Sequence, residues 1–260
     1  PKNLRNTVFP FNYNDYEQLV NICDKNDIGV IKMEVIRNFG PEHNFLHKVR
    51  ELATKRGIVL IFDECTSGFR ETFGGIHKKY SVNPDMAMFG KTLGNGYALT
   101  AVVGIREVMS SVEDTFISST FWTERIGPTA ALKTLEVMEN IQSWELITDI
   151  GLKIREGWSY IFNQYKINFS LSGIPSLSSY NFEDNDLEIQ TYITQEMLKK
   201  GFLASNRFYA CISHTKEIQN KYFTALDEVM HSLSKMKFDK NQIINNLDGP
   251  VRQSGFKRLN

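Results

Sequence analysis

The segment that most constrains the fold is an unbroken apolar run, residues 58–62, that ends in the carboxylate of Asp63. A continuous run of this kind predicts a strand buried on both faces, and such strands are typical of parallel sheets. In open sheets built from alternating strands and helices, ligands bind at the carboxyl ends of the strands. The sequence therefore predicts an α/β fold with Asp63 at the ligand-binding edge of a parallel sheet.

A lysine follows the next predicted strand in the same way. A short apolar run, residues 85–89, leads into Gly90 and Lys91, and the loop that comes next holds Gly94 and Gly96. Because glycine has no side chain, a bound group can approach Lys91 closely in such a loop. The two segments together predict one anion, Asp63, and one amine, Lys91, at neighbouring strand ends.

Helical patterns alternate with these strands. Asn14 or Asp15 can cap a helix that runs to about Asp24, and Gly57 is a suitable carboxyl-terminal cap for a helix over residues 44–57. The other elements expected in this part are strands over 29–35, 58–63, 85–89 and 100–104 and a helix over 127–140. Alternation of helix and strand favours a parallel sheet.

A change in composition near residue 142 marks the predicted domain boundary, and Ser143 is expected to cap a long helix that runs towards Asn163. The elements expected beyond it are strands over 167–171, 177–182 and 208–213 and helices over 187–200 and 216–236. We therefore divide the chain into part of a large α/β domain (1–142), a small α+β domain (143–240) and a polar tail without clear periodicity (241–260).

Charge and cysteine usage exclude several classes of function. Thirty basic residues balance thirty acidic ones, so nothing favours nucleic acid or an anionic membrane as a partner. Cys23, Cys65 and Cys211 are far apart in the sequence, which predicts free thiols, a reducing compartment and no metal site. No apolar run could span a bilayer, and residues 1–5 do not form a signal peptide. We expect a cytoplasmic protein whose partner is a small molecule or a second copy of the chain.

A set of motifs extends over most of the chain. It consists of Asp63-Glu-Cys-Thr-Ser-Gly-Phe-Arg70, Pro84-Asp85, Gly90-Lys91, Gly94, Gly96 and Gly104, with Tyr13-Asn-Asp15 before them and Ile212-Ser-His-Thr215 after them. In order and spacing these motifs resemble the class III pyridoxal-phosphate-dependent aminotransferases. Within that family the closest likeness is to glutamate-1-semialdehyde aminomutase and its relatives.

The resemblance implies a fold-type-I transferase in which residues 1–142 form the C-terminal part of the large, mixed or parallel-sheet, cofactor-binding domain. Family members carry a substantial segment before the point matched by Tyr13, including a loop that holds the cofactor phosphate. We therefore expect the chain to be a fragment, or its remainder to lie on a separate chain. The family likeness also implies a homodimer with a shared active site.

The resemblance also implies roles for the two residues at the strand ends. Lys91 would form a Schiff base with pyridoxal 5'-phosphate and afterwards shuttle a proton, because a primary amine can form an imine and, when burial lowers its pKa, act as a base. Asp63 would face the pyridine nitrogen and keep it protonated, which is worth roughly 4 kcal/mol at about 4 Å and an effective dielectric near 20. The plainer alternatives are a solvated surface lysine and an aspartate that caps the next turn.

Four further residues are implied to contact the cofactor. Cys65 takes the place of the valine that usually packs on one face of the ring, where a small apolar thiol can serve. Ser119 and Thr120 resemble the segment that reaches the cofactor phosphate across the dimer, and Asn38 is expected near the phenolic oxygen. A plain loop position is the alternative for Ser119, Thr120 and Asn38. Glu64 is expected to support the loop by hydrogen bonding.

The predicted function is amino transfer between an amino acid and a carbonyl compound through Lys91. Intramolecular amino exchange, as in the aminomutases, is one alternative, and a truncated or non-catalytic relative that dimerises without cofactor is another. The aminomutases carry a glutamate shortly before the position of Ile212, whereas residues 206–209, Asn-Arg-Phe-Tyr, offer none. This difference favours the transferase.

Overall fold

The computed structural model describes residues 2–36, 38–120 and 123–254. The chain forms two compact units, Pro1–Trp144 and Glu145–Asn260, and each has its own sheet. Within the described ranges, none of the helices combines the length and the apolar character that crossing a bilayer requires.

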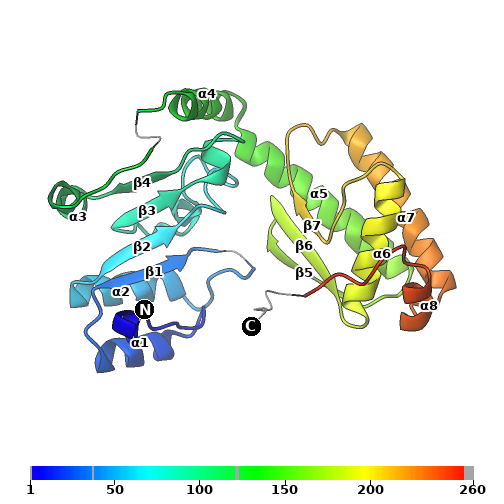
Figure 1. The fold of residues 1–260 in the computed structure, drawn as a ribbon, viewed down its shortest axis with the longest axis horizontal. Helices are drawn as coiled ribbons and strands as arrows, with labels where there is room; N and C mark the ends of the chain where they lie inside the picture. Colours follow the sequence, from blue (N-terminus) through cyan, green and yellow to red (C-terminus); the bar gives the residue numbers. More distant parts are fainter. Residues whose placement is uncertain (1, 37, 121–122, 255–260) are drawn as a thin grey trace. The chain divides into compact units, whose positions relative to one another are not determined.

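The first unit contains a four-stranded sheet with helices before, between and after its strands (Figure 1). Its elements are η1 (Lys2–Leu4), α1 (Tyr16–Lys25), β1 (Val30–Glu34), α2 (Phe45–Arg56), β2 (Val59–Asp63), η2 (Ile76–Tyr80), β3 (Met86–Phe89), η3 (Lys91–Leu93), β4 (Ala101–Gly104), α3 (Arg106–Met109), η4 (Ser110–Asp114) and α4 (Ile126–Ile141). The predicted strands are therefore present, and their bounds agree with the sequence patterns to within two residues.

The sheet has the order β1-β2-β3-β4, in which β1, β2 and β3 are parallel and β4 is antiparallel to β3. Glu34 pairs with Asp63, and Asp63 pairs with Met88, so the carboxyl ends of the three parallel strands lie at one edge. The parallel pairing predicted from the sequence is confirmed for β1, β2 and β3, and the antiparallel β4 makes the sheet mixed, which the family resemblance also allowed. It places Asp63 directly beside the strand that leads to Lys91.

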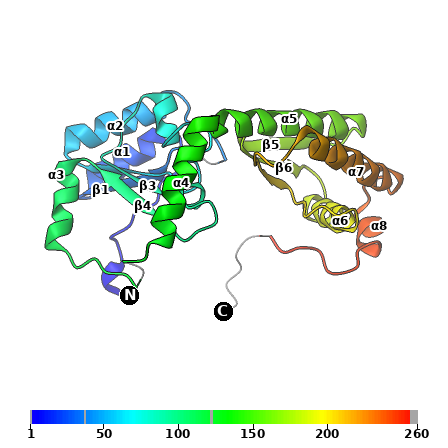
Figure 2. The ribbon, with the colours of Figure 1, turned by 90° about the horizontal axis from the view of Figure 1, so that it is seen from above.

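Only one face of this sheet is fully covered by the described chain. Leu60 and Phe62 of β2 are buried, whereas the alternate residues Val59, Ile61 and Asp63 are half-buried. Helix α2 contacts β2 and lies beside α1 (Figure 2), and Ala131 of α4 joins the buried cluster of β3. The prediction that β2 is buried on both faces is therefore wrong for the described residues.

Two of the three predicted helix caps form. The side chain of Asp15 accepts a hydrogen bond from the Gln18 N–H at 2.9 Å, and Gly57 ends α2 with φ +67°. Ser143 does not act as a cap, because it is the first residue of α5 (Ser143–Gln164) and follows α4 after the single residue Gln142. Among the described residues, its buried hydroxyl has no hydrogen-bond partner.

The second unit has an antiparallel sheet of order β5-β6-β7, and helices pack on one of its faces. Besides α5, its elements are β5 (Phe169–Ile174), β6 (Leu177–Phe182), α6 (Asp186–Lys199), β7 (Arg207–Tyr209), α7 (Lys216–Lys235) and α8 (Lys240–Asn245). Trp158 of α5 is fully buried in this core and donates a hydrogen bond to the Tyr222 hydroxyl of α7 at 2.8 Å. The unit is an α+β structure, as the pattern predicted.

Two predictions in this unit need correction. Strand β7 ends at Tyr209, because the segment after it turns back to the start of α7, whereas the sequence pattern extended the strand to residue 213. The predicted structureless tail contains α8, which Asp239 caps through the Gln242 N–H and which buries Ile243 in the core. One buried residue in a short polar helix gives too weak a period to detect from sequence.

Candidate active site

Asp63 ends β2 with both carboxylate oxygens engaged. Its Oδ1 accepts the backbone N–H of Cys65 at 3.1 Å, and its Oδ2 forms an ion pair with the Lys32 ammonium at 2.9 Å. Burial raises the pKa of Asp63, but the hydrogen bonds from Lys32 and Cys65 outweigh it, so the pKa lies below its ordinary value. Asp63 is therefore an ionised carboxylate that also caps the turn after its strand.

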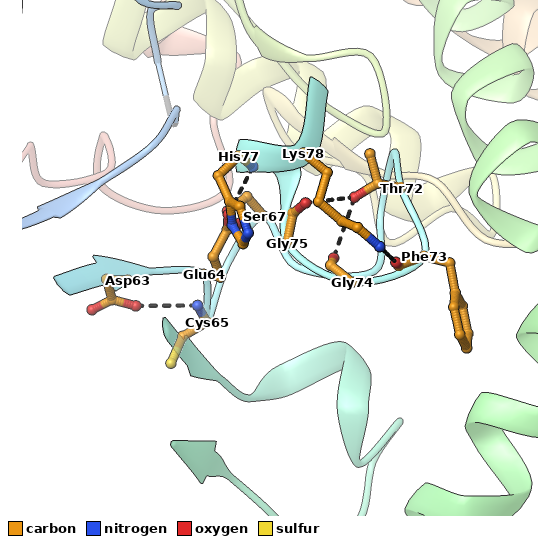
Figure 3. A network of polar contacts seen from close by, with 10 residues as sticks. All are labelled: Asp63, Glu64, Cys65, Ser67, Thr72, Phe73, Gly74, Gly75, His77 and Lys78. Atoms are coloured by element: carbon orange, nitrogen blue, oxygen red, sulfur yellow. Dashed lines mark hydrogen bonds and ion pairs between the residues drawn. The ribbon is translucent and has the colours of Figure 1, made fainter. Parts of the chain in front are cut away.

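Glu64, the next residue, anchors the loop behind Asp63 (Figure 3). It is fully buried and accepts hydrogen bonds from the Ser67 hydroxyl at 2.5 Å and the His77 backbone N–H at 3.0 Å, and its Oε1 lies 2.9 Å from His77 Nδ1. A side chain on Gly75 would place a Cβ in collision with that imidazole ring, so this position requires glycine. The predicted supporting role of Glu64 is confirmed.

The far end of the same loop is held by its own polar groups. Thr72 donates a hydrogen bond from its hydroxyl to the Gly75 carbonyl at 2.9 Å, and Lys78 donates from its ammonium to the Phe73 carbonyl at 2.9 Å (Figure 3). These contacts and those of Glu64 fix both ends of residues 64–78. The loop that carries Cys65 and Thr66 is therefore fixed by hydrogen bonds at both of its ends.

Lys91 follows Gly90 at the end of β3 and adopts a left-handed backbone, with φ +44°. Its ammonium donates a hydrogen bond to the Thr66 hydroxyl at 2.9 Å and its side chain is exposed. A non-glycine residue in this region is uncommon and costs about 1–3 kcal/mol, and such residues cluster at functional sites. Exposed Lys166 and Lys237 share this conformation, so the functional interpretation of Lys91 depends on its strand-end position and its contact with Thr66.

Cys65 lies between the acid and the amine. A Cβ built on Gly90 would lie 3.5 Å from the Cys65 sulfur, so the thiol packs against the residue that precedes Lys91. Burial raises the pKa of Cys65 and so does its hydrogen bond with Asp63, while Lys91 and Lys32 offset only part of this. A thiol with a raised pKa is a poor nucleophile, which agrees with the predicted packing role.

The other predicted cofactor residues lie on exposed segments of the first unit. Ser119 and Thr120 are in the coil between η4 and α4, and Asn38 is in the bend after β1. The amino terminus of α4, close to Thr120 in sequence, already holds the Glu124 carboxylate, which accepts the Gly127 N–H at 3.0 Å. The roles of Ser119, Thr120 and Asn38 stay predictions.

Two site residues were missed by the sequence analysis, Lys32 and Thr66. Lys32 is a charged residue within an otherwise apolar strand, and its alternation with Ile31 and Met33 could have placed it on the open face. Thr66 lies within the motif that suggested the family, but nothing local indicates that its hydroxyl meets Lys91. That contact depends on how two separate strand ends come together.

A carboxylate and a lysine at neighbouring strand ends agree with the predicted fold-type-I transferase, and comparison with solved structures supports this fold. The FumI protein of Sphingopyxis sp. MTA144, solved in its PLP internal aldimine form, matches with a TM-score of 0.84 and 20% identity over 91% of this chain and 60% of its own. An omega-transaminase from Sphaerobacter thermophilus matches with a TM-score of 0.81 and 18% identity, over 89% of this chain and 58% of its own. The predicted fold type is confirmed.

Residues 38–229 match the family model of the class-III aminotransferases, and the chain belongs to that family. It is 31% identical to the 3-aminobutyryl-CoA aminotransferase of Cloacimonas acidaminovorans, over 91% of this chain and 61% of the relative. It is 29% identical to the glutamate-1-semialdehyde 2,1-aminomutase of Methanosphaera stadtmanae, over 86% of this chain and 58% of the relative. The chain thus spans about three fifths of the length of these curated relatives, and the predicted family is confirmed.

Proposed function

We propose that this chain carries the lysine-bearing part of a pyridoxal-phosphate-dependent aminotransferase. The observation that carries the proposal is the pair of strand ends, in which Asp63 is ionised and Lys91 is strained, with Cys65 and Thr66 between them. Membership of the class-III aminotransferase family supports the same conclusion. The two units of the chain would then be the C-terminal part of a large cofactor-binding domain and a small domain.

The chemistry of these side chains fits pyridoxal phosphate. The cofactor presents an aldehyde carbon, which a primary amine can bind, and a ring nitrogen, which a carboxylate can keep protonated. Lys91 supplies an exposed amine whose partner is the neutral hydroxyl of Thr66, and Asp63 supplies the ionised carboxylate. The bound cofactor would act as an electron sink for charge that develops on the substrate carbon.

Each residue would have a defined task in the reaction. Lys91 would hold the aldehyde carbon through its Nζ and, when released, take and return a proton at the substrate carbon that bears the amino group. Thr66 would hold the released amine through the hydrogen bond it already accepts. Cys65 would pack on one face of the ring, Ser119 and Thr120 would bind the phosphate, and Asn38 would lie near the phenolic oxygen.

The proposed substrates are an amino acid and a carbonyl compound, and the proposed assembly is a cytoplasmic homodimer with a shared active site. A second candidate function is intramolecular amino exchange. It is supported by the similarity to glutamate-1-semialdehyde 2,1-aminomutases from Methanosphaera stadtmanae and Sulfurisphaera tokodaii, which are 29% and 28% identical to this chain. The two functions differ in whether a free keto product leaves the enzyme.

An absorption spectrum tests the proposal. The chain, purified together with the phosphate-binding segment that family members carry and mixed with pyridoxal phosphate, should gain the visible band of a lysine-bound cofactor, and Lys91→Ala should lose it. Lys133→Ala is a matched control, because Lys133 is an exposed lysine on α4 that pairs with Glu136. A protein with intact Lys91 that forms no band contradicts the proposal. Separating free keto product from isomerised amine, after candidate amino donors are added, then distinguishes transferase from mutase.

A further inference from the structure

Lys32 reaches Asp63 across the open face of the sheet. In the register of β1 and β2, Lys32 pairs with Ile61, and Asp63 is two residues further along the same face. The long side chain therefore extends diagonally, and its ammonium lies 2.9 Å from Asp63 Oδ2. The ion pair joins a residue with no assigned role to the carboxylate that the proposed function assigns to the ring nitrogen.

This ion pair engages the Asp63 oxygen that the Cys65 N–H leaves open. The Cys65 N–H already takes Asp63 Oδ1, so Lys32 engages the other oxygen. The contact is accessible, because the side chain of Lys32 is 52% exposed and that of Asp63 is 22% exposed. Glu34 and Cys65 also lie close to Lys32, and Lys91 lies close to Cys65. Lys32 is thus the cation that the described contacts bring onto the Asp63 carboxylate.

We propose that Lys32 is a positioning residue that competes with the cofactor's ring nitrogen for the Asp63 carboxylate. The inference rests on the proposed function. An ammonium on Oδ2 offsets the charge of Asp63, so a protonated ring nitrogen gains less from the same carboxylate. The size of the effect follows from the exposure of the pair, because an ion pair in contact with solvent changes an affinity by roughly two- to fivefold.

Binding of 4'-deoxypyridoxine 5'-phosphate by the chain purified together with the phosphate-binding segment that family members carry tests this inference. The probe keeps the ring nitrogen and the phosphate but has no aldehyde, so Lys91 cannot bond to it. Lys32→Met removes the charge and keeps most of the length, and we expect it to bind the probe roughly two- to fivefold more tightly than the unsubstituted protein. Lys32→Arg keeps a cation and should bind the probe like the unsubstituted protein. Lys32→Gln repeats the test if the methionine variant fails to fold.

A second probe separates competition at the ring nitrogen from a general change in the site. This second probe is the carbocyclic analogue of 4'-deoxypyridoxine 5'-phosphate, in which a C–H group replaces the ring nitrogen. Lys32→Met should bind this analogue with the same affinity as the unsubstituted protein does. The inference is overturned if Lys32→Met and the unsubstituted protein bind the nitrogen-containing probe with equal affinity. It is also overturned if Lys32→Met binds both probes more tightly by the same factor. If no variant binds either probe, the proposed function fails together with the inference, whereas the first two outcomes leave the proposed function standing.

Discussion

Replacing Glu64 by leucine tests whether this buried carboxylate holds the loop between β2 and η2. Leucine leaves the Ser67 hydroxyl and the His77 backbone N–H without their acceptor, and both residues are buried or nearly so. Each unsatisfied buried donor costs about 1–3 kcal/mol, and removal of a buried charge returns part of that cost. We therefore expect the free energy that keeps this loop closed to fall by about 2–4 kcal/mol.

Hydrogen exchange at the His77 amide measures this loss directly, because that N–H is protected by Glu64. A loss of about 2–4 kcal/mol corresponds to roughly 30- to 1,000-fold faster exchange, since about 1.4 kcal/mol is one factor of ten. Glu64→Gln is the matched control, because its amide oxygen can still accept from His77, and it should lose about 1 kcal/mol. Exchange in Glu64→Leu that stays within about threefold of the unsubstituted protein refutes the reasoning.

Three further substitutions test other parts of the structure. Thr66→Val removes the hydroxyl that accepts from Lys91, so kcat for amino transfer should fall roughly two- to tenfold with KM little changed, as steady-state kinetics would measure. Gly151→Ala would drive a Cβ into the Pro175 carbonyl oxygen, so urea unfolding should report a loss of about 2 kcal/mol or more. The pKa of Asp63 is lowered in the folded state, so the ionised carboxylate stabilises the fold at any pH above its unfolded pKa of about 4. This stabilisation is lost as the pH falls through the folded pKa. Asp63→Asn should therefore flatten the decline in unfolding free energy between about pH 5 and 3.

Each of these predictions has a control or a contrary outcome. Thr66→Ser keeps the hydroxyl and should keep kcat, so equal losses in the serine and valine variants would contradict a role for that hydrogen bond. Gly249→Ala has no atom within 4 Å of the added Cβ and should leave stability unchanged. An acid decline that is equally steep in the Asp63→Asn variant would mean that this carboxylate contributes nothing to it.

The residues at the carboxyl edge of the sheet were predictable from sequence, because the apolar runs that form the strands end at polar residues. Asp63 and Lys91 each follow such a run, and the helices between the first three strands require parallel pairing. The antiparallel direction of β4 was also available from sequence length, since the short connection from Phe89 to Ala101 leaves no room for a crossover. The apolar run does not show which face of β2 is covered, because this depends on where helices such as α2 pack.

The contacts among the site residues were less predictable than their positions. Lys32 and Asp63 are far apart in sequence and meet only because β1 and β2 pair in one register. A shift of that register by one residue would turn Lys32 to the opposite face from Asp63. The contact of Thr66 with Lys91 likewise requires the braced loop after β2 to meet the turn after β3. Such contacts follow from tertiary structure and leave no local pattern.

The position and contacts of Lys91 separate a functional lysine from a solvated surface lysine better than its backbone does. Glycine or asparagine adopts a left-handed conformation at lower cost, so a position selected for stability alone would favour one of them. The turn itself is firmly set, because Leu93 donates its N–H to the Gly90 carbonyl at 3.0 Å and a Cβ on Gly94 would collide with the Tyr97 carbonyl oxygen. The chain therefore keeps a lysine where its geometry favours glycine. Lys166 and Lys237 are exposed lysines with the same left-handed backbone, at φ +54° and +52°, so the conformation alone does not mark a functional lysine. What sets Lys91 apart is its place at a strand end and its hydrogen bond to the Thr66 hydroxyl.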